Sequence, residues 1–197
     1  MRRRRPGVLK PTLQLAAAIA LGLAARDERV AAKDEAARAT VYRARTEGLD
    51  RAMPVVTDLG STYAVFGVAA ALLAAGRRHL ARDVMVAGLG AWTLAQAAKP
   101  LFRRPRPYDV AAVEITVRRP AGMSYPSGHP AVAAAVDRVL QPHLRGPAHG
   151  WFARIPKLVA LSRVYVGVHY PSDVAGGLLM GRALGNLWLR YTAADRR

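Results

Sequence analysis

The stretch "LSRVYVGVHYPSDVAGGLLMGRALG" occupies residues 161–185 and contains a sharp break between two apolar segments. Pro171 prevents one continuous helix here, because proline has no amide hydrogen and its ring clashes with the preceding turn. We therefore expect His169 in a tight turn and Asp173 in the first turn of the helix that follows. An aspartate in that position can accept a hydrogen bond from one imidazole nitrogen and leave the other free to attack.

The helix after the break carries a glycine at every fourth position, namely Gly177, Gly181 and Gly185. Small residues at this spacing allow two helices to pack closely. Because Ala and Gly are common throughout the chain, the spacing alone is only a weak indication of such packing.

Long uncharged segments alternate with short clusters of charge along the rest of the chain, and hydrophobic residues make up 52% of its 197 residues. A helix needs about 20 apolar residues to cross a bilayer. Five segments approach that length: 59–76, 84–98, 130–140, 155–168 and 174–189. Since three of the five contain charges, buried helices of a soluble protein are the alternative.

Residues 1–54 precede these segments and form a region of their own. Residues 11–25 are apolar after a basic start, which fits either a short first span or the apolar core of a signal peptide. Residues 26–54 are charged and helix-prone, and we expect an amphipathic segment near the membrane surface on the outer side. Residues 55–197 form the transmembrane core, and we find no internal repeat or second domain.

The charge balance is strongly basic, with 30 Lys and Arg residues against 13 Asp and Glu and a net charge of +17. A soluble domain of that charge would suggest nucleic acid as a partner. Here the charges lie in short clusters between uncharged segments, as in membrane proteins, so no nucleic-acid partner is expected. The absence of cysteine excludes disulfides, thiolate metal sites and a cysteine nucleophile.

The basic residues also predict an orientation. If the chain crosses the membrane at each apolar segment in turn, three basic regions fall on the same side: the loops at 77–82 and 145–157 and the terminal Arg196-Arg197. The positive-inside rule assigns that side to the cytoplasm. Residues 99–128 and the turn at 169–173 then face outward from the bacterial cell membrane. The outward side has its own basic cluster: Arg103, Arg104, Arg106, Arg118 and Arg119. We expect these arginines to serve a ligand, although Arg103 and Arg104 could equally be interfacial anchors for anionic lipid.

Two further motifs lie in the outward connection 99–128. In "KPLFRRPRP", Lys99 is followed after six residues by Arg106-Pro107. In "YPSGHP", Ser127 suits the N-cap of a helix and Pro130 suits its first turn. The exposed amides and the positive dipole end of such a helix start form a seat for an anion.

Taken together, the outward segments contain two histidines, one carboxylate and at least three cations. This set suits phosphoryl transfer without a metal. The cations neutralise the phosphate oxygens, one histidine attacks, and the other protonates the leaving oxygen.

The motifs resemble the three signatures of the type 2 phosphatidic acid phosphatase superfamily in order and in spacing. Those signatures read Lys, six residues, Arg-Pro; then Pro-Ser-Gly-His; then Ser-Arg, five residues, His, three residues, Asp. All eleven specified positions are met: Lys99, Arg106, Pro107, Pro126, Ser127, Gly128, His129, Ser162, Arg163, His169 and Asp173. The resemblance covers residues 99–173. It implies an all-α fold, a polytopic transmembrane helical bundle of about five to six helices.

The resemblance also implies a role for each matched side chain. His169 would be the nucleophile that forms a phosphohistidine, Asp173 would orient it, and His129 would be the general acid. The phosphate would be held by Lys99, Arg106, Arg163, Ser127 and the Gly128 amide. No metal and no cofactor are expected, and the site would lie at the outer membrane face.

Two features depart from this pattern. Pro130 follows the motif histidine and removes one amide that could point at the anion. Asp137 and Arg138 interrupt the apolar segment behind it, where a charge at mid-bilayer costs roughly 2.5–3.5 kcal/mol. We therefore expect this pair to face the bundle interior, or Asp137 to lie near the membrane interface.

The sequence thus predicts an integral membrane phosphatase that hydrolyses a lipid phosphate or polyprenyl (di)phosphate, with membrane lipids as partners. A vanadium haloperoxidase, in which the same pocket holds vanadate, is the alternative enzyme, although those relatives are soluble and longer. A non-catalytic basic membrane protein that binds anionic lipid would explain the net charge but not the motif histidines. The sequence names neither the lipid nor the oligomeric state.

Overall fold

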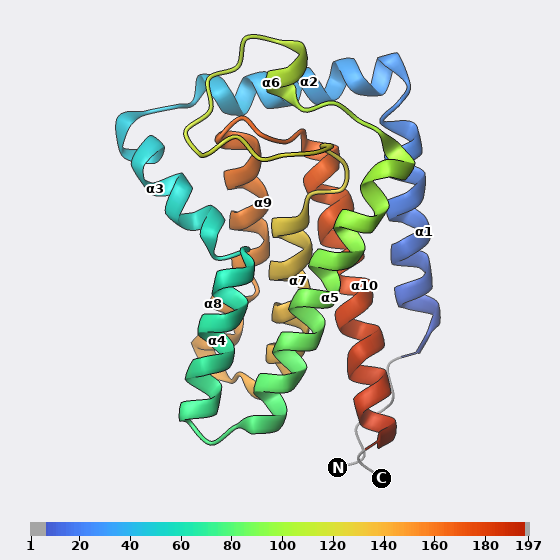
Figure 1. Ribbon diagram of the computed structural model, residues 1–197, viewed down its shortest axis with the longest axis vertical. Coiled ribbons are helices and arrows are strands. Elements are labelled where there is room, and N and C mark those ends of the chain that lie inside the picture. Colours follow the sequence, from blue (N-terminus) through green and yellow to red (C-terminus); the bar gives the residue numbers. More distant parts are fainter. Residues whose placement is uncertain (1–6, 196–197) are drawn as a thin grey trace.

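The structure of the protein, a computed structural model, describes residues 7–195. The basic residues before position 7 and the predicted cytoplasmic Arg196-Arg197 lie outside this part. All regular secondary structure between residues 7 and 195 is helical, which confirms the predicted all-α class. The helices that run along the long axis as a bundle (Figure 1) are α1 (Leu9–Ala24), α4 (Thr62–Ala74), α5 (Arg78–Phe102), α7 (Gly128–Leu140), α9 (Ile155–Tyr165) and α10 (Pro171–Asp195).

The other helices connect these or lie across the bundle ends. They are α2 (Glu28–Arg43), α3 (Glu47–Asp58), α6 (Pro107–Val110), the 3-10 helix η1 (Gln141–His143) and α8 (Gly146–Phe152). α2 crosses one end of the bundle, with α6 beside it (Figure 1). By length and composition, no single helix in the described part of the chain qualifies as a membrane span; α3 and α4, which meet at a bend of 62°, qualify only as a pair.

Each of the five predicted apolar segments corresponds to one bundle helix, but the helix ends differ. The segment 59–76 becomes α4, which begins later because residues 59–61 form the turn after α3. Ser61 caps the new start, where its Oγ accepts a hydrogen bond from the backbone nitrogen of Ala64 at 3.2 Å. The segment 84–98 is the middle of α5, whose charged ends an apolar pattern cannot reveal.

α7 lies at the centre of the bundle, in contact with α4, α5, α9 and α10. Its residues 131–135 are buried, and four of these five are alanines. The distance between two packed helices depends on the side chains at their contact. Alanines on a central helix therefore let its neighbours approach closely from several directions.

The glycines of α10 mark its contact with α7. A Cβ atom at Gly177 would lie 2.3 Å from the carbonyl oxygen of Ser127, and one at Gly181 would lie 2.1 Å from that of Ala131. Gly185 continues the row one turn further along. No side chain fits at these separations, so glycine sets how closely the two backbones approach. The close packing indicated by the four-residue spacing is confirmed.

The N-terminal helices pack on this bundle. α1 lies along α10, and the Tyr125 hydroxyl donates a hydrogen bond to the carbonyl oxygen of Ala18 in α1. Asp27 is the N-cap of α2, and its carboxylate accepts hydrogen bonds from the backbone nitrogens of Arg29 and Val30. Asp34 and Arg38 of α2 are buried, so one face of this helix lies against the bundle end.

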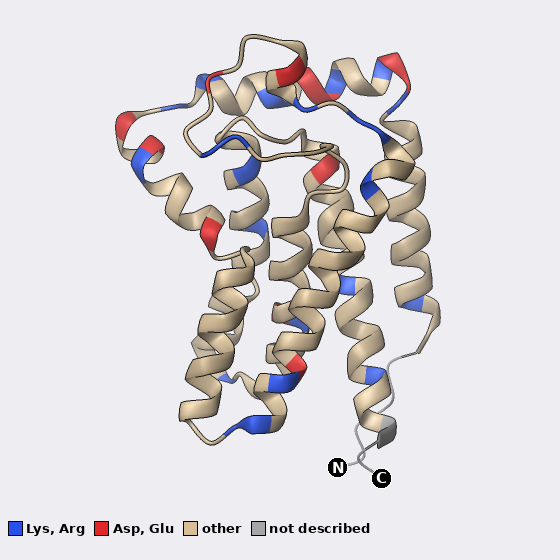
Figure 2. Cartoon of the chain, viewed as in Figure 1, with Lys and Arg blue, Asp and Glu red and all other residues tan. Residues whose placement is uncertain are grey.

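Charged side chains gather toward the two ends of the bundle, and the stretch between them is largely uncharged (Figure 2). Asp137 and Arg138 lie half-buried near the C-terminal end of α7. Arg138 Nε donates to Asn186 Oδ1 of α10 at 2.9 Å, and Gln141 Nε2 donates to Asp137 Oδ1 at 2.6 Å. The pair therefore has polar partners at the bundle end, in agreement with the expectation from the sequence.

Gly181→Ala is expected to destabilise the protein, because the added methyl group forces α10 away from the Ala131 backbone. Overpacking of this kind costs about 1–3 kcal/mol. Gly67→Ala is the matched control. Gly67 lies in α4 with nothing within 4 Å of its Cβ position, so the same change there should stabilise by about 0.5–1 kcal/mol. Melting temperatures in one detergent test this, and equal shifts for the two variants would contradict it.

Candidate active site

Three segments far apart in the sequence meet at the end of the bundle that α2 covers (Figure 1). They are the end of α5 with the loop after it, the start of α7, and the stretch from the end of α9 through the turn to the start of α10. All eight predicted site residues lie on these segments: Lys99, Arg106, Ser127, Gly128, His129, Arg163, His169 and Asp173. Electrostatic interactions link Lys99, Arg106 and Arg163 to both imidazoles, and the imidazoles to each other. The structure therefore brings the predicted residues together.

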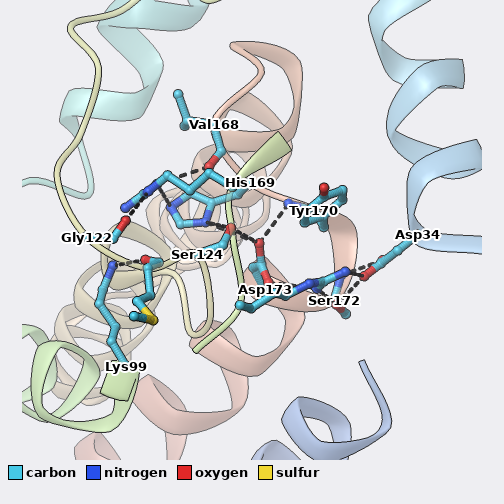
Figure 3. Close-up of polar contacts among 12 residues, drawn as sticks. Asp34, Lys99, Gly122, Ser124, Val168, His169, Tyr170, Ser172 and Asp173 are labelled. Carbon is cyan, nitrogen blue, oxygen red and sulfur yellow. Dashed lines mark hydrogen bonds and ion pairs between the residues drawn. The ribbon is translucent and has the colours of Figure 1, made fainter. Parts of the chain in front are cut away.

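His169 lies in the turn before α10, as the position of Pro171 predicts, and it is buried. Its Nδ1 lies 3.4 Å from Asp173 Oδ2 and 3.3 Å from Ser124 Oγ (Figure 3). Its Nε2 lies 3.2 Å from a terminal nitrogen of Arg106. Because a guanidinium can only donate, Nε2 accepts and Nδ1 carries the proton. Burial lowers the pKa of His169 well below its usual value and the charge of Arg106 lowers it further, so the ring is neutral.

Asp173 is fully buried in the first turn of α10, and donors from several segments fix its carboxylate (Figure 3). Oδ2 accepts from the Ser124 hydroxyl and, at 2.8 Å, from the backbone nitrogen of Tyr170. Oδ1 accepts from Arg104 at 2.8 Å. The contact with His169 is the longest of the hydrogen bonds to this carboxylate. The other donors therefore fix the position of Asp173, and its Oδ2 faces the imidazole.

Arg104 connects this carboxylate to α2. One terminal nitrogen donates to Asp173, and the other donates to Asp34 Oδ2 at 2.7 Å. The second oxygen of Asp34 accepts from the backbone nitrogen of Ser172 at 2.9 Å. The guanidinium also lies over the Tyr170 ring, 4.1 Å from its centroid. Arg104 is therefore a buried bridge between two carboxylates, a role that the sequence did not predict.

Sequence reasoning missed Asp34, Ser124 and the role of Arg104. Asp34 accepts a hydrogen bond from the backbone nitrogen of Ser172, which lies 138 residues later in the sequence. It lies in a segment with many charges, and nothing local distinguishes it from the other carboxylates there. Ser124 had one signal, since it lies two residues before the Pro126-Ser127 motif.

Three cations surround the space between the histidines. Lys99 Nζ and Arg106 Nε donate to carbonyl oxygens of the loop before α7 at 2.6 and 2.8 Å, and one terminal nitrogen of Arg163 donates to Thr57 Oγ1 at 3.0 Å. Arg163 Nε and Ser127 Oγ are buried without a hydrogen-bond partner in the protein. A buried polar atom without a partner costs about 1–3 kcal/mol, so both atoms indicate a bound ligand.

The chemistry of these donors selects the kind of ligand. Guanidinium and ammonium groups bind oxyanions such as phosphate through charge-assisted hydrogen bonds. Between residues 7 and 195, no three His, Asp or Glu side chains gather in an arrangement that could hold a metal ion. The three cations therefore give this site the chemistry needed to bind a phosphate-like anion beside two imidazoles.

The start of α7 is held from two sides. Ser127 occupies the predicted N-cap position, but its side chain makes no capping hydrogen bond. Its backbone nitrogen donates to the carbonyl oxygen of Asp173 at 3.0 Å, which ties α7 to α10. On the other side, a Cβ atom at Gly60 would lie 2.6 Å from the carbonyl oxygen of His129. The bend between α3 and α4 therefore packs directly against the helix start that carries His129.

The other arginines that the sequence placed on the outward side lie outside this anion-binding site. Arg103, Arg118 and Arg119 are exposed. Arg119 pairs with Asp109 at 2.9 Å and lies over the Tyr108 ring, so it stabilises the loop rather than the site. Of the predicted ligand-binding cluster, only Arg106 faces the two histidines directly.

The model of the PAP2 superfamily matches residues 84–197. The chain is similar to a decaprenylphosphoryl-5-phosphoribose phosphatase of Mycobacterium tuberculosis, with 39% identity over 110 residues that cover 53% of this chain and 58% of that protein. It is also similar to the undecaprenyl-diphosphatase BcrC of Bacillus subtilis, with 28% identity over 151 residues, 73% of this chain and 75% of that one. The fold matches a transmembrane PAP2-type phosphatidylglycerolphosphate phosphatase from Bacillus subtilis with a TM-score of 0.81 and 25% identity, over 95% of this chain and 98% of that one.

Arg104→Gln is expected to destabilise the protein by about 3–5 kcal/mol, because it leaves two buried carboxylates without their shared cation. Arg103→Gln is the matched control, since Arg103 is exposed and adjacent in sequence. Adding Asp34→Asn to the Arg104 variant should recover part of the loss by removing one uncompensated charge. Melting temperatures of the four proteins test this, and equal melting of the Arg103 and Arg104 variants would rule out the bridge.

Proposed function

The chain belongs to the PAP2 superfamily, and on that premise we propose that it is a membrane phosphatase acting on a phosphate or diphosphate ester of a polyprenyl or related lipid. The observation that carries the proposal is the gathering of Lys99, Arg106 and Arg163 around two imidazoles. Two buried polar atoms beside them have no partner in the protein, which supports an anionic ligand at this position.

The substrate phosphate binds between the two histidines. The three cations neutralise its oxygens, and Ser127 and the Gly128 amide donate hydrogen bonds to them. Arg106 contacts the nitrogen of His169 that is needed for attack. A phosphate oxygen is a stronger acceptor for a guanidinium than a ring nitrogen, so the arriving substrate draws Arg106 away and frees Nε2.

His169 Nε2 then attacks phosphorus. A P–N bond forms while the P–O bond to the leaving group breaks. The negative charge of the bound phosphate favours the protonated form of His129, which gives a proton to the leaving oxygen. Asp173 holds the Nδ1 hydrogen and stabilises the positive charge that the attacking ring acquires. In the second step His129 takes a proton from water, the water oxygen attacks phosphorus, and the P–N bond breaks to release phosphate.

Polyprenyl phosphates are the favoured substrate class. The two sequence relatives described above act, by their names, on decaprenyl and undecaprenyl compounds. The polar groups of the site itself recognise the phosphate and not the lipid tail, so the choice of lipid rests on these relatives.

We place the site at the outer face of the bacterial cell membrane. The matched solved structure is described as transmembrane. The loop between α4 and α5 contains basic residues and lies at the end of the bundle opposite the site (Figure 1). The positive-inside rule assigns that end to the cytoplasm, which leaves the site outside.

Purified protein in detergent should release phosphate from a polyprenyl diphosphate with EDTA present, because cations and histidines do the chemistry. A panel with phosphatidic acid and phosphatidylglycerol phosphate ranks the lipids. Arg106→Gln should lower the rate by at least about 100-fold, whereas the exposed Arg103→Gln should keep the wild-type rate. Turnover that stops with EDTA and returns with magnesium would overturn the mechanism. No turnover on any of the lipids would favour a non-catalytic lipid-binding protein.

The two histidines should differ in covalent labelling. His169→Ala removes the attacking nitrogen, so acid-labile label from a radiolabelled phosphate substrate should be absent and the rate should fall to background. His129→Ala removes only the proton donor, worth about 10²–10⁴-fold, and the loss should shrink for p-nitrophenyl phosphate, whose leaving group needs no proton. Label that persists in His169→Ala and disappears in His129→Ala would mean that the two roles are reversed.

A further inference from the structure

The end of the bundle opposite the active site contains a polar cavity of about 430 Å³. Residues of α1, α7, α9 and α10 line it, together with the segment between α7 and α9. Arg138 in its wall lies nine residues after His129 on α7, which corresponds to about 14 Å along the helix axis. None of the site residues named above lines this cavity, and the proposed reaction makes no use of it.

Basic side chains dominate the cavity wall. Lys10, Arg138, Lys157 and Arg182 line it with one carboxylate, that of Asp137. The carboxylate accepts a hydrogen bond from a neighbouring amide, and Arg138 is held by its bond to α10. The charge of Asp137 also interacts with Arg182. Within residues 7–195, Lys10 and Lys157 form no ion pair with a carboxylate within 4 Å. Four cations against one carboxylate favour an anionic ligand.

The cavity continues into an apolar groove. A groove of about 300 Å³ between α1 and α10 is lined by Leu9, Leu13, Ala17 and Leu179. Both hollows share Lys10 and Gln14 in their walls, so the groove begins where the basic cavity ends. Leu9 and Leu13 are 70% and 58% exposed, which leaves apolar surface open for contact. A charged seat joined to an apolar groove matches a ligand with an anionic head and a hydrocarbon tail.

One atom of the cavity wall lacks a donor. Gln141 Nε2 donates to Asp137 Oδ1 and, at 3.3 Å, to the carbonyl oxygen of His149. Its Oε1 is buried and has no partner among the described residues. An amide oxygen can only accept. A hydroxyl group in the head of the ligand would supply the missing donor.

We propose that this cavity and groove bind one phospholipid whose headgroup combines a phosphodiester with a free hydroxyl, as in phosphatidylglycerol. The phosphodiester lies among the four cations, the hydroxyl donates to Gln141 Oε1, and one acyl chain follows the groove between α1 and α10. The proposal rests on the membrane location proposed above. The lipid is a resident ligand and not a substrate, because it lies at the other end of α7 from both histidines.

Native mass spectrometry of the full chain in detergent tests the binding. Phosphatidylglycerol should be retained as one bound lipid. Phosphatidylmethanol, with the same charge and no hydroxyl, should bind more weakly, and zwitterionic phosphatidylcholine most weakly. Equal retention of the three lipids would overturn the proposal. Glycerol 3-phosphate supplies an anion without a tail, and if it raises the melting temperature as much as phosphatidylglycerol does, the site takes a free anion and the lipid assignment falls.

Substitutions in the cavity wall test whether phosphatidylglycerol binds at this position. Lys157→Gln with Arg182→Gln should weaken phosphatidylglycerol binding by about 30-fold, from the loss of two basic contacts to an anionic lipid. Arg29→Gln with Lys33→Gln removes the same charge from exposed positions on α2 and should leave binding unchanged. If both pairs bind alike, the placement is wrong.

Gln141→Leu should erase the preference for phosphatidylglycerol over phosphatidylmethanol, and a preserved preference would overturn the assignment of the hydroxyl. His169→Ala should retain the lipid although it loses turnover. Lipid binding is thus measured independently of turnover. A failure of the lipid-site proposal can therefore be distinguished from a failure of the proposed phosphatase activity.

Discussion

The close contact between α7 and α10 is the constraint on which the site depends. At Gly177 the α10 backbone comes so near the carbonyl oxygen of Ser127 that a Cβ atom would lie 2.3 Å from it. The backbone nitrogen of Ser127 in turn donates to the carbonyl oxygen of Asp173 at 3.0 Å. Both contacts lie at the start of α7 and within the first two turns of α10. The helix start that carries His129 and the helix start that orients His169 therefore have one fixed separation, which the close packing at Gly177 helps to set.

Charge balance explains why α2 takes part in a site that the bundle otherwise builds. Asp173 is fully buried, and a buried carboxylate needs a cation or several donors. Arg104 supplies that cation and is itself balanced by Asp34 of α2. In the described part of the chain, Lys99, Arg106 and Arg163 form no ion pair with a carboxylate within 4 Å. The excess positive charge around the histidines is the condition for binding a phosphate there.

The sequence predicted the features that local chemistry determines, and it missed those that depend on distant contacts. Pro171 ends one helix and starts the next wherever it occurs, so the turn at His169 could be placed. The N-cap at Ser127 followed from residue preference, but that preference suggests a capping bond, and the structure leaves the hydroxyl free. Asp34 reaches its partners only because α2 folds across the bundle end, and no local pattern encodes that path. The helix ends of α5 were missed because apolar patterning stops at the first charge, whereas a helix does not.

The length of α7 connects the two ends of the molecule. With 13 residues it is about 20 Å long, whereas α5 and α10, with 25 residues each, reach about 38 Å. The hydrocarbon core of a bilayer is about 30 Å thick. In the proposed membrane setting the long helices therefore reach both interfaces while the central helix falls short of them. The proposed phosphate site near its start and the basic cavity near its end are therefore both set back from the ends of the longer helices. The two proposed sites differ in their chemistry, because the imidazoles near the start of α7 would break a P–O bond, whereas the cations near its end would only bind the phosphate.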